Sequence, residues 1–142
     1  MKNFLIICAI AVGFAACEKD AGEGGTSVIE GQVYKIYTWQ DDLTGEIITL
    51  YYEPHSGKDV FIIYSDNETE VYDDKFETDY NGRYHFEYLR KGDYTLYTYA
   101  DSTVDISSTI ELKYEYPIFK HIKINSNNSD NSVEDFVIEK NQ

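Results

Sequence analysis

From Val28 onward the chain alternates apolar or aromatic residues with polar ones, and no stretch sustains the periodicity of a helix. The continuous apolar run Val60–Tyr64 is typical of a central strand that is buried on both faces. Further strand-like segments occur at 28–39, 46–52, 76–80, 83–87, 94–99, 106–116, 118–124 and 133–139, with Pro117 interrupting the late pair. This pattern predicts an all-β fold, a single Greek-key β-sandwich of about seven to eight strands.

The clearest local signal is a hairpin centred on Asn81 and Gly82. The two residues favour a type I′ turn, because Asn and Gly tolerate positive φ at both central positions. On the outgoing strand, Tyr84 and Phe86 share one face while His85 lies on the other, since strand side chains alternate. The sequence therefore predicts two adjacent paired strands here, with an aromatic inner face.

The amino-terminal residues 1–16 contain Lys2 and then an unbroken apolar run from Phe4 to Ala16. This is the pattern of a signal peptide, and the run is too short for a permanent membrane span of about 20 residues. Phe14-Ala15-Ala16-Cys17 resembles the lipobox of bacterial lipoproteins. That resemblance implies a diacylglyceryl group on Cys17 and a membrane partner held through it. The alternative is an ordinary secretory signal that leaves a free thiol.

The segment after Cys17 bears on where the protein is located. Glu18-Lys19-Asp20 resembles the export signal of lipoproteins displayed on the outer face of some Gram-negative outer membranes. We therefore expect lipid anchoring at the bacterial outer membrane, on its surface or, alternatively, in its periplasmic leaflet. Residues 17–27 are glycine-rich and predict a flexible tether, and residues 28–142 form the predicted β-sandwich domain.

The charge and the cysteine content of the chain exclude several kinds of partner and chemistry. The leader removes one of 12 basic residues and none of the 26 acidic ones, so the mature chain carries a formal charge of −15. A nucleic-acid partner is disfavoured, because phosphate binding requires clustered Lys and Arg. Cys8 leaves with the leader and Cys17 takes the lipid, so no cysteine remains for a disulfide, a metal or a nucleophile. All 14 tyrosines lie in the mature part, as suits half-buried strands.

The middle of the chain resembles the carboxypeptidase regulatory-like family. The matching segments are Gly31-Gln32-Val33, the stretch from Thr78 to Phe86, and Gly92-Asp93-Tyr94-Thr95-Leu96. The resemblance implies a prealbumin-like (transthyretin-like), Cna-B-like β-sandwich. It implies fold-defining roles for Gly31, Asp79, Gly82, Gly92 and Tyr94, but no active site.

Some relatives of this fold carry an intramolecular Lys–Asn isopeptide bond promoted by a buried acid. Lys35 and Asn125 could supply the two partners, but Thr98 stands where the acid would be needed, so the bond is not expected. The acidic stretch from Asp66 to Asp74 lacks the spacing of an EF-hand and is interpreted as a solvated loop, with calcium binding as the alternative. His55, His85 and His121 are too dispersed to predict a zinc site.

Two surface features remain as candidate sites. Tyr97 and Tyr99 face outward if Tyr94 and Leu96 face inward, and with His85 they form a possible binding surface for a glycan or a protein. Asp101-Ser102-Thr103 resembles a bacterial O-glycosylation motif, with Ser102 as the acceptor. No catalytic residue, metal or cofactor is predicted. We expect a non-catalytic envelope module for binding or assembly. The alternative is an accessory domain or subunit of an envelope enzyme or transporter system.

Overall fold

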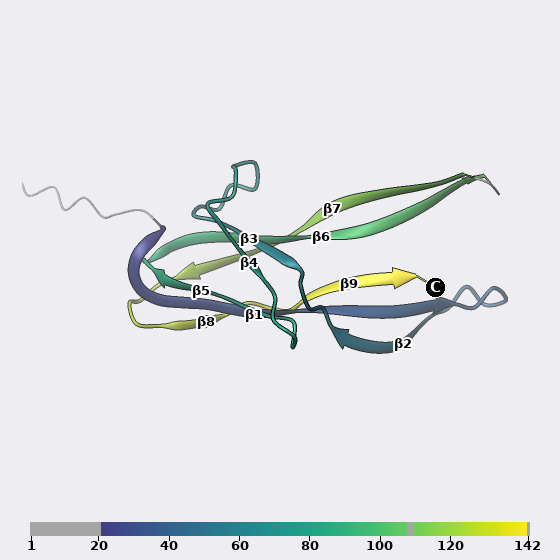
Figure 1. Ribbon diagram of the computed structural model, residues 1–142, viewed down its shortest axis with the longest axis horizontal. Helices are drawn as coiled ribbons and strands as arrows, with labels where there is room; N and C mark the ends of the chain where they lie inside the picture. The colour runs from purple at the N-terminus through teal and green to yellow at the C-terminus, as the bar shows by residue number, and fades with distance from the viewer. Residues whose placement is uncertain (1–20, 108–109, 142) are drawn as a thin grey trace, which may run out of the picture.

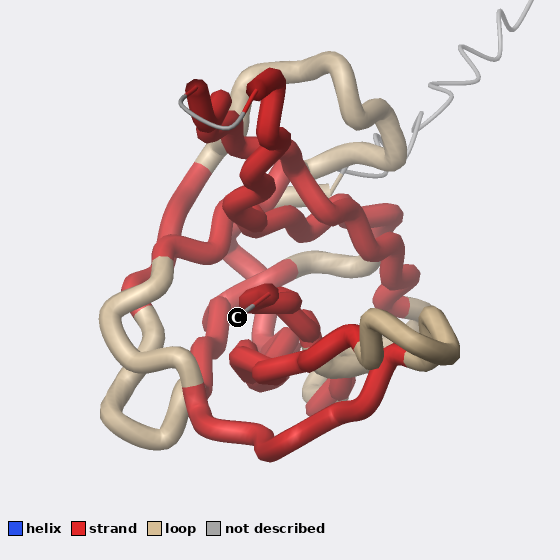
Figure 2. The backbone as a smooth tube through the Cα atoms, turned by 90° about the vertical axis from the view of Figure 1, so that its right-hand side faces the viewer, coloured by secondary structure: helices blue, strands red, loops and turns tan. Residues whose placement is uncertain are grey.

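The computed structural model describes residues 21–107 and 110–141, which form an all-β protein with two stacked sheets (Figure 1). Viewed along the longest axis, the described chain contains strands and loops only (Figure 2). Its nine strands are β1 (Glu23–Gln40), β2 (Ile47–Pro54), β3 (Asp59–Ile63), β4 (Asp74–Glu77), β5 (Arg83–Leu89), β6 (Gly92–Ser107), β7 (Ile110–Ile124), β8 (Asp130–Ser132) and β9 (Phe136–Asn141). The predicted β-sandwich is confirmed. The described part has at least one strand more than predicted, because β8 forms inside the polar stretch before the last strand.

Strand β1 is the centre of the first sheet. Its backbone N–H and C=O at Val33 bond to Gly82 and His55, so β5 and β2 follow one another along the same edge. Along the opposite edge β1 pairs in parallel with β8 and then with β9. The second sheet has the order β4-β3-β6-β7 and is antiparallel throughout.

The hydrophobic core lies between the two sheets and is built by the alternating inward positions of their strands. Val60, Ile62, Tyr94 and Leu96 from the second sheet are fully buried. Facing them, the first sheet contributes Ile29, Val33, Tyr84, Phe86, Leu89, Phe136 and Ile138. The prediction that residues 60–64 form a buried central strand is confirmed, since β3 lies between β4 and β6.

The hairpin at Asn81 and Gly82 differs from the prediction. Strand β4 belongs to the second sheet and β5 to the first, so the segment crosses between the layers and does not form a two-stranded ladder. Gly82 has a φ of +72°, but Asn81 is not among the residues with positive φ, which rules out a type I′ turn. Instead, the Asp79 carboxylate accepts hydrogen bonds from the backbone N–H groups of Asn81 and Arg83.

Three further boundaries differ from the sequence-based expectation. Strand β1 begins at Glu23, inside the segment expected to be a tether, and Ser27 is fully buried. Strand β6 continues past Tyr99, the expected end of that strand, as far as Ser107. Strand β7 passes through Pro117 without interruption. Proline is tolerated there because β7 is the edge strand of its sheet and needs no second partner.

Tyr94 and Gly92 hold the beginning of the described chain in place. The Tyr94 hydroxyl accepts a hydrogen bond from the Gly22 N–H at 2.9 Å and donates one to the Arg90 carbonyl at 2.7 Å. Gly92 has a φ of +150°, and a Cβ there would lie 2.6 Å from the Ala21 side chain. None of the described segments forms a helix long and apolar enough to span a bilayer.

Candidate functional site

Two strand ribbons extend beyond the core toward the same end of the molecule, opposite the beginning of β1, and β9 runs beside the first of them (Figure 1). We call residues 35–40 of β1 with β2 the first ribbon, and residues 100–107 of β6 with residues 110–118 of β7 the second ribbon. Both ribbons expose large apolar side chains: Trp39, Leu43, Ile47, Ile48, Leu50, Tyr51 and Tyr52 on the first, and Leu112, Tyr114 and Tyr116 on the second. The ribbons therefore carry most of the exposed large apolar residues of the described chain.

The first ribbon directs part of this apolar surface to the same side as the core. Val33 is fully buried in the core, and alternation along β1 places Lys35, Tyr37 and Trp39 on that same face. Tyr37 pairs with Tyr51, and their rings stack with centroids 4.3 Å apart. Trp39, which is 44% exposed, pairs with Ile48 on the same face.

Polar contacts join β1 and β2 on this face of the first ribbon. The Tyr37 hydroxyl donates a hydrogen bond to Glu53 Oε1 at 2.8 Å, and Lys35 Nζ lies 3.4 Å from the same oxygen. The hydrogen bond from Tyr37, followed by that from Lys35, lowers the pKa of Glu53, whose desolvation opposes the shift. The bond to Glu53 also raises the pKa of Tyr37 to about 12. These contacts hold the Tyr37–Tyr51 stack in register.

The second ribbon presents a matching aromatic face. Ala100 is buried in the core and pairs with Tyr116, and Ser102 pairs with Tyr114, so both tyrosines lie on the core-facing side of their sheet. The rings of Tyr114 and Tyr116 are 6.3 Å apart and almost half exposed. The core-facing sides of both sheets therefore continue past the core as uncovered aromatic surface.

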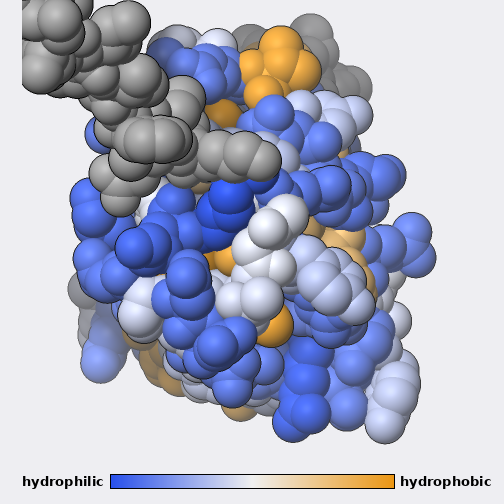
Figure 3. Space-filling view, turned by 90° about the vertical axis from the view of Figure 1, so that its left-hand side faces the viewer, coloured by the Kyte–Doolittle hydropathy of each residue, from blue (hydrophilic) through white to orange (hydrophobic). Residues whose placement is uncertain are grey.

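The opposite end of the molecule, where β1 begins, has a more hydrophilic surface. Viewed from the side where β1 begins, the visible surface is largely hydrophilic, with scattered apolar side chains (Figure 3). Most of the exposed large apolar side chains of the described residues therefore belong to the ribbons.

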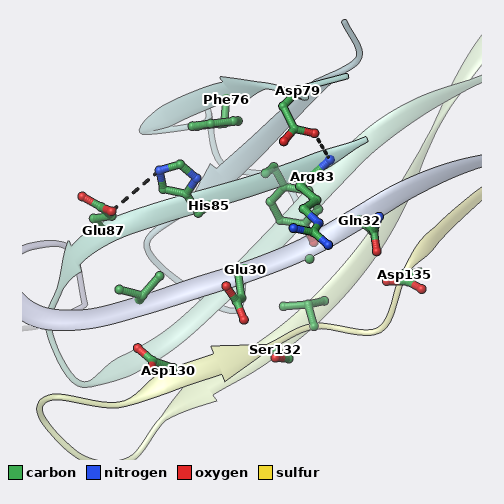
Figure 4. Close-up of a pocket in the computed structure, with 14 residues that line it drawn as sticks. Glu30, Gln32, Phe76, Asp79, Arg83, His85, Glu87, Asp130, Ser132 and Asp135 are labelled. Atoms are coloured by element: carbon green, nitrogen blue, oxygen red, sulfur yellow. Dashed lines mark hydrogen bonds and ion pairs between the residues drawn. The ribbon is translucent and has the colours of Figure 1, made fainter. Parts of the chain in front are cut away.

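A groove of about 800 Å³ lies over β1, β5 and β8 and is lined mainly by polar side chains (Figure 4). Arg83 extends over β1 between the side chains of Glu30 and Gln32. His85 contacts the ring of Phe76, with centroids 4.6 Å apart, and its Nε2 lies 3.7 Å from Glu87. The remaining polar lining comes from Asp79, Asp130, Ser132 and Asp135.

Tyr84 and Gly31 lie beneath this groove, on the core-facing side of β1 and β5. A Cβ on Gly31 would lie 2.3 Å from the Tyr84 hydroxyl, so the absence of a side chain makes room for the phenol. The Tyr84 hydroxyl is buried and has no hydrogen-bond partner among the described residues. Burial, followed by the nearby Asp135 carboxylate, raises the pKa of Tyr84, so the hydroxyl stays neutral and able to donate.

Tyr97 and Tyr99 lie on the outer face of the second sheet, away from the core. Tyr97 is only 8% exposed, because it stacks on Phe61 at 4.9 Å and also contacts Phe119. Tyr99 contacts Tyr97 edge-on at 5.7 Å and is partly exposed. His85 belongs to the other sheet, so the structure does not bring the three predicted residues together on one surface.

The remaining candidates are dispersed. Cys17 lies outside the described residues. Ser102 is partly exposed on β6. Lys35 contacts Glu53, while the Asn125 amide donates to the Lys123 carbonyl and the Thr98 hydroxyl to the Asp59 carbonyl.

The acidic loop uses its carboxylates locally. Asp73 accepts from the Tyr64 N–H at 2.7 Å, and Glu70 accepts from Ser65 and Asn67. Glu68 lies 2.9 Å from His121 Nε2. Within residues 21–107 and 110–141, no group of three or more His, Cys, Asp or Glu is arranged to hold a metal ion.

Sequence reasoning did not identify the ribbon faces or the groove. The alternation at residues 47–52 and 112–116 was visible, but it does not distinguish a strand covered by a second layer from one that extends past it. The groove combines residues from β1, β5 and β8, which are brought together by a parallel pairing that local sequence patterns do not encode.

No protein-family profile matches the chain, and no curated protein sequence matches it. Among solved structures, the fold is similar to a crystal structure of a "putative carbohydrate binding protein" from Pseudomonas aeruginosa. The two are 16% identical in sequence, with a TM-score of 0.49, and the match covers 84% of this chain and 92% of that chain.

Proposed function

We propose that this chain is a lipid-anchored, non-catalytic module of the bacterial cell envelope that binds a partner protein through its two ribbons. The observation that carries the proposal is the uncovered aromatic surface on the core-facing side of both ribbons. Trp39, Ile48 and Tyr51 on one ribbon, and Leu112, Tyr114 and Tyr116 on the other, are each 41–51% exposed. Contiguous exposed apolar surface of this kind marks interaction sites in folded proteins.

The charges around this surface indicate the chemistry of the partner. Asp41, Asp42 and Glu46 surround the exposed Leu43 at the turn of the first ribbon, and that turn contains no basic residue. A complementary partner surface has an apolar centre and a basic rim, as is usual where electrostatics guides association.

The direction of the ribbons argues against the protein's own membrane as the ligand. The chain enters the fold at the beginning of β1, and the ribbons run to the other end of the molecule (Figure 1). With Cys17 in a lipid layer, the aromatic surface would point away from that layer. The lipid anchor itself rests on the signal-peptide pattern and on the lipobox-like sequence before Cys17.

Cross-linking from the ribbon surface tests this function. A photoreactive phenylalanine analogue placed at Tyr114 in the full-length protein should yield a discrete protein adduct on irradiation of intact cells. The same analogue with Tyr51→Glu and Tyr116→Glu should give a much weaker adduct, because two carboxylates would be desolvated in an apolar interface. Raising the salt concentration should weaken the isolated complex, since the rim contacts are ionic.

Val71→Glu provides the matched control. Val71 is 82% exposed in the loop between β3 and β4, away from the ribbons, so this charge should leave the adduct unchanged. Equal loss of the adduct in the control and in the ribbon variants would contradict the proposal. An adduct formed only with a second copy of this chain, or only with glycan, would also contradict it.

A further inference from the structure

Strand β7 has a long free edge. Among the described strands it pairs only with β6, so the backbone N–H and C=O groups along its other side have no strand partner (Figure 1). At 15 residues it is the longest edge strand of the described chain. A free edge of this kind is a template for pairing with a strand of another molecule.

Pro117 indicates which backbone groups face the free edge. Proline has no N–H, and the pairing of β7 with β6 continues through Pro117 and Tyr99 without a shift in register. The nitrogen of Pro117 therefore points away from β6. Because backbone groups alternate in an antiparallel ladder, the N–H and C=O groups of Lys113 and Glu115 point to the free edge as well. A new ladder could use both of these residues and would end at Pro117.

The side chains of residues 112–116 are complementary to those of a second copy. When two copies of β7 pair antiparallel about Tyr114, Lys113 of each copy lies opposite Glu115 of the other. On the second face of the strand, Tyr114 lies opposite Tyr114, and Leu112 lies opposite Tyr116. All five residues are exposed in the single chain. Opposite charges and aromatic residues that face each other across two strands stabilise the pairing.

The charges select this register among its neighbours. A two-fold axis at Lys113 would place two lysines opposite each other, and one at Glu115 would place two glutamates opposite each other. Like charges directly across a strand pair are destabilising. Strand β2, the edge strand of the first ribbon, has Glu53 as its one charged residue, so its charges favour no register.

The pairing of Glu115 within its own sheet adds a further reason. Asp101 on β6 lies directly opposite Glu115, so two carboxylates face each other across β6 and β7. In the two-copy arrangement, Lys113 of the second copy would lie on the other side of Glu115. The second copy therefore supplies a cation beside a pair of like charges.

We propose that two copies of this chain form a symmetric dimer by antiparallel pairing of β7 over residues 112–116. The second sheets of the two copies then join into one continuous sheet. Because β7 runs from the ribbon end toward the core, antiparallel pairing places the two cores, and the beginnings of the two described chains, at opposite ends of the dimer. With the lipid anchor proposed above, such a dimer would join copies on two facing membrane layers.

Sedimentation velocity with charge-exchanged variants tests the dimer. The mature chain with Cys17→Ala, at about 1 µM to about 1 mM, should show a monomer–dimer equilibrium, since this range covers small, weak interfaces. Lys113→Glu and Glu115→Lys should each raise the dissociation constant roughly tenfold or more, because both ion pairs become repulsive. The double variant, and an equimolar mixture of the two single variants, should associate again.

Lys91→Glu is the matched control. It makes the same charge change at an exposed turn between β5 and β6, away from β7, and should leave the dissociation constant unchanged. Melting temperatures establish that every variant is folded. A wild-type chain that stays monomeric at all concentrations would overturn the proposal. A dimer that neither weakens in the single variants nor recovers in the double variant would overturn it too.

Cysteine cross-linking tests the register independently. Tyr114→Cys should form an intermolecular disulfide by itself under mild oxidation, because position 114 lies opposite its own copy at a distance that a disulfide spans. Leu112→Cys and Tyr116→Cys should cross-link when they are mixed but not separately, since each lies roughly 13 Å along the strand from its own copy. Cross-linking of Leu112→Cys with itself and not with Tyr116→Cys would contradict this register.

The dimer can fail separately from the proposed binding of a partner protein. It is measured on purified protein without a partner, and Lys113 and Glu115 lie on the face of β7 opposite to the aromatic surface. A monomeric chain that still yields the partner adduct in cells would contradict the dimer alone. A dimeric chain that yields only an adduct with its own copy would contradict the partner alone.

Discussion

At the residue scale, Gly82 and Asp79 show how a few side chains direct the chain from one sheet to the other. Asp79 accepts hydrogen bonds from two backbone N–H groups of the turn, and the Gly82 N–H donates to the Asp79 carbonyl at 2.9 Å. Gly82 then passes so close to β1 that its carbonyl accepts the Val33 N–H at 2.8 Å. The turn is thus part of the contact between β5 and the central strand.

Alanine substitutions at two glycines should separate backbone strain from close packing. Gly82 and Gly45 share a φ of +72°, but a Cβ at Gly82 would lie 2.4 Å from the Val33 carbonyl oxygen, whereas at Gly45 nothing lies within 4 Å. We expect Gly45→Ala to reduce the free energy of unfolding by about 1 kcal/mol. Gly82→Ala should cost about 3 kcal/mol or more, because steric overlap adds to the strain. Urea denaturation measures both, and equal costs would contradict the contact.

At the element scale, the sequence predicted correctly those strands whose burial follows from their own residue pattern. The apolar run at 60–64 identified a buried central strand, and alternation placed Tyr84 and Phe86 inward and His85 outward, as found. The segment around Asn81 was misassigned because a turn signal does not reveal whether its flanking strands join one sheet or two. Pro117 does not interrupt β7 as the sequence predicted, because proline is excluded from a central strand but not from an edge strand.

Acidification should loosen the first ribbon through Glu53. Hydrogen bonds from Tyr37 and Lys35 lower the pKa of Glu53 in the folded protein below its ordinary value of 4.5. The resulting stabilisation is fully present above that ordinary value and is lost as the pH falls through the lowered pKa. Glu53→Gln should therefore lower the melting temperature at about pH 7 but make much less difference at about pH 3.

Glu46→Gln serves as the control for this titration. Glu46 is exposed at the turn of the same ribbon, and no ion pair involves it among the described residues. Its substitution should change the melting temperature little at either pH. A Glu53→Gln effect that is the same at both pH values would show that the carboxylate charge does not stabilise the ribbon.

At the scale of the whole molecule, the described chain begins at one end and its ribbons lie at the other (Figure 1). The groove was not predictable from local sequence patterns, because β8 and β9 return from the end of the chain to pair in parallel with β1. Such long-range pairing is set by the closure of the core, through residues such as Phe136, and not by any short motif.

The anchoring of the molecule is tested at Cys17. Growth with an alkyne-labelled fatty acid should label the wild-type protein, and Cys17→Ala should carry no label, because acylation requires the thiol. Exposure of intact cells to a protease should degrade the protein if it is displayed on the outer surface. A mature protein whose Cys17 is unlabelled and reacts with a maleimide would contradict the anchor and would indicate an ordinary secretory signal.

The 18-residue length of β1 limits how far the first ribbon lies from the point where the chain enters the fold. At about 3.3 Å per residue, a fully extended strand of this length measures about 60 Å, which is the upper limit for the distance from the chain entry to the tip of the first ribbon. Inserting two residues into the ribbon would lengthen the arm by about 7 Å and keep each ring on its side. Inserting one would exchange the two sides unless a bulge absorbed the extra residue, as the register shift in β2 beside Tyr37 and Thr38 already does.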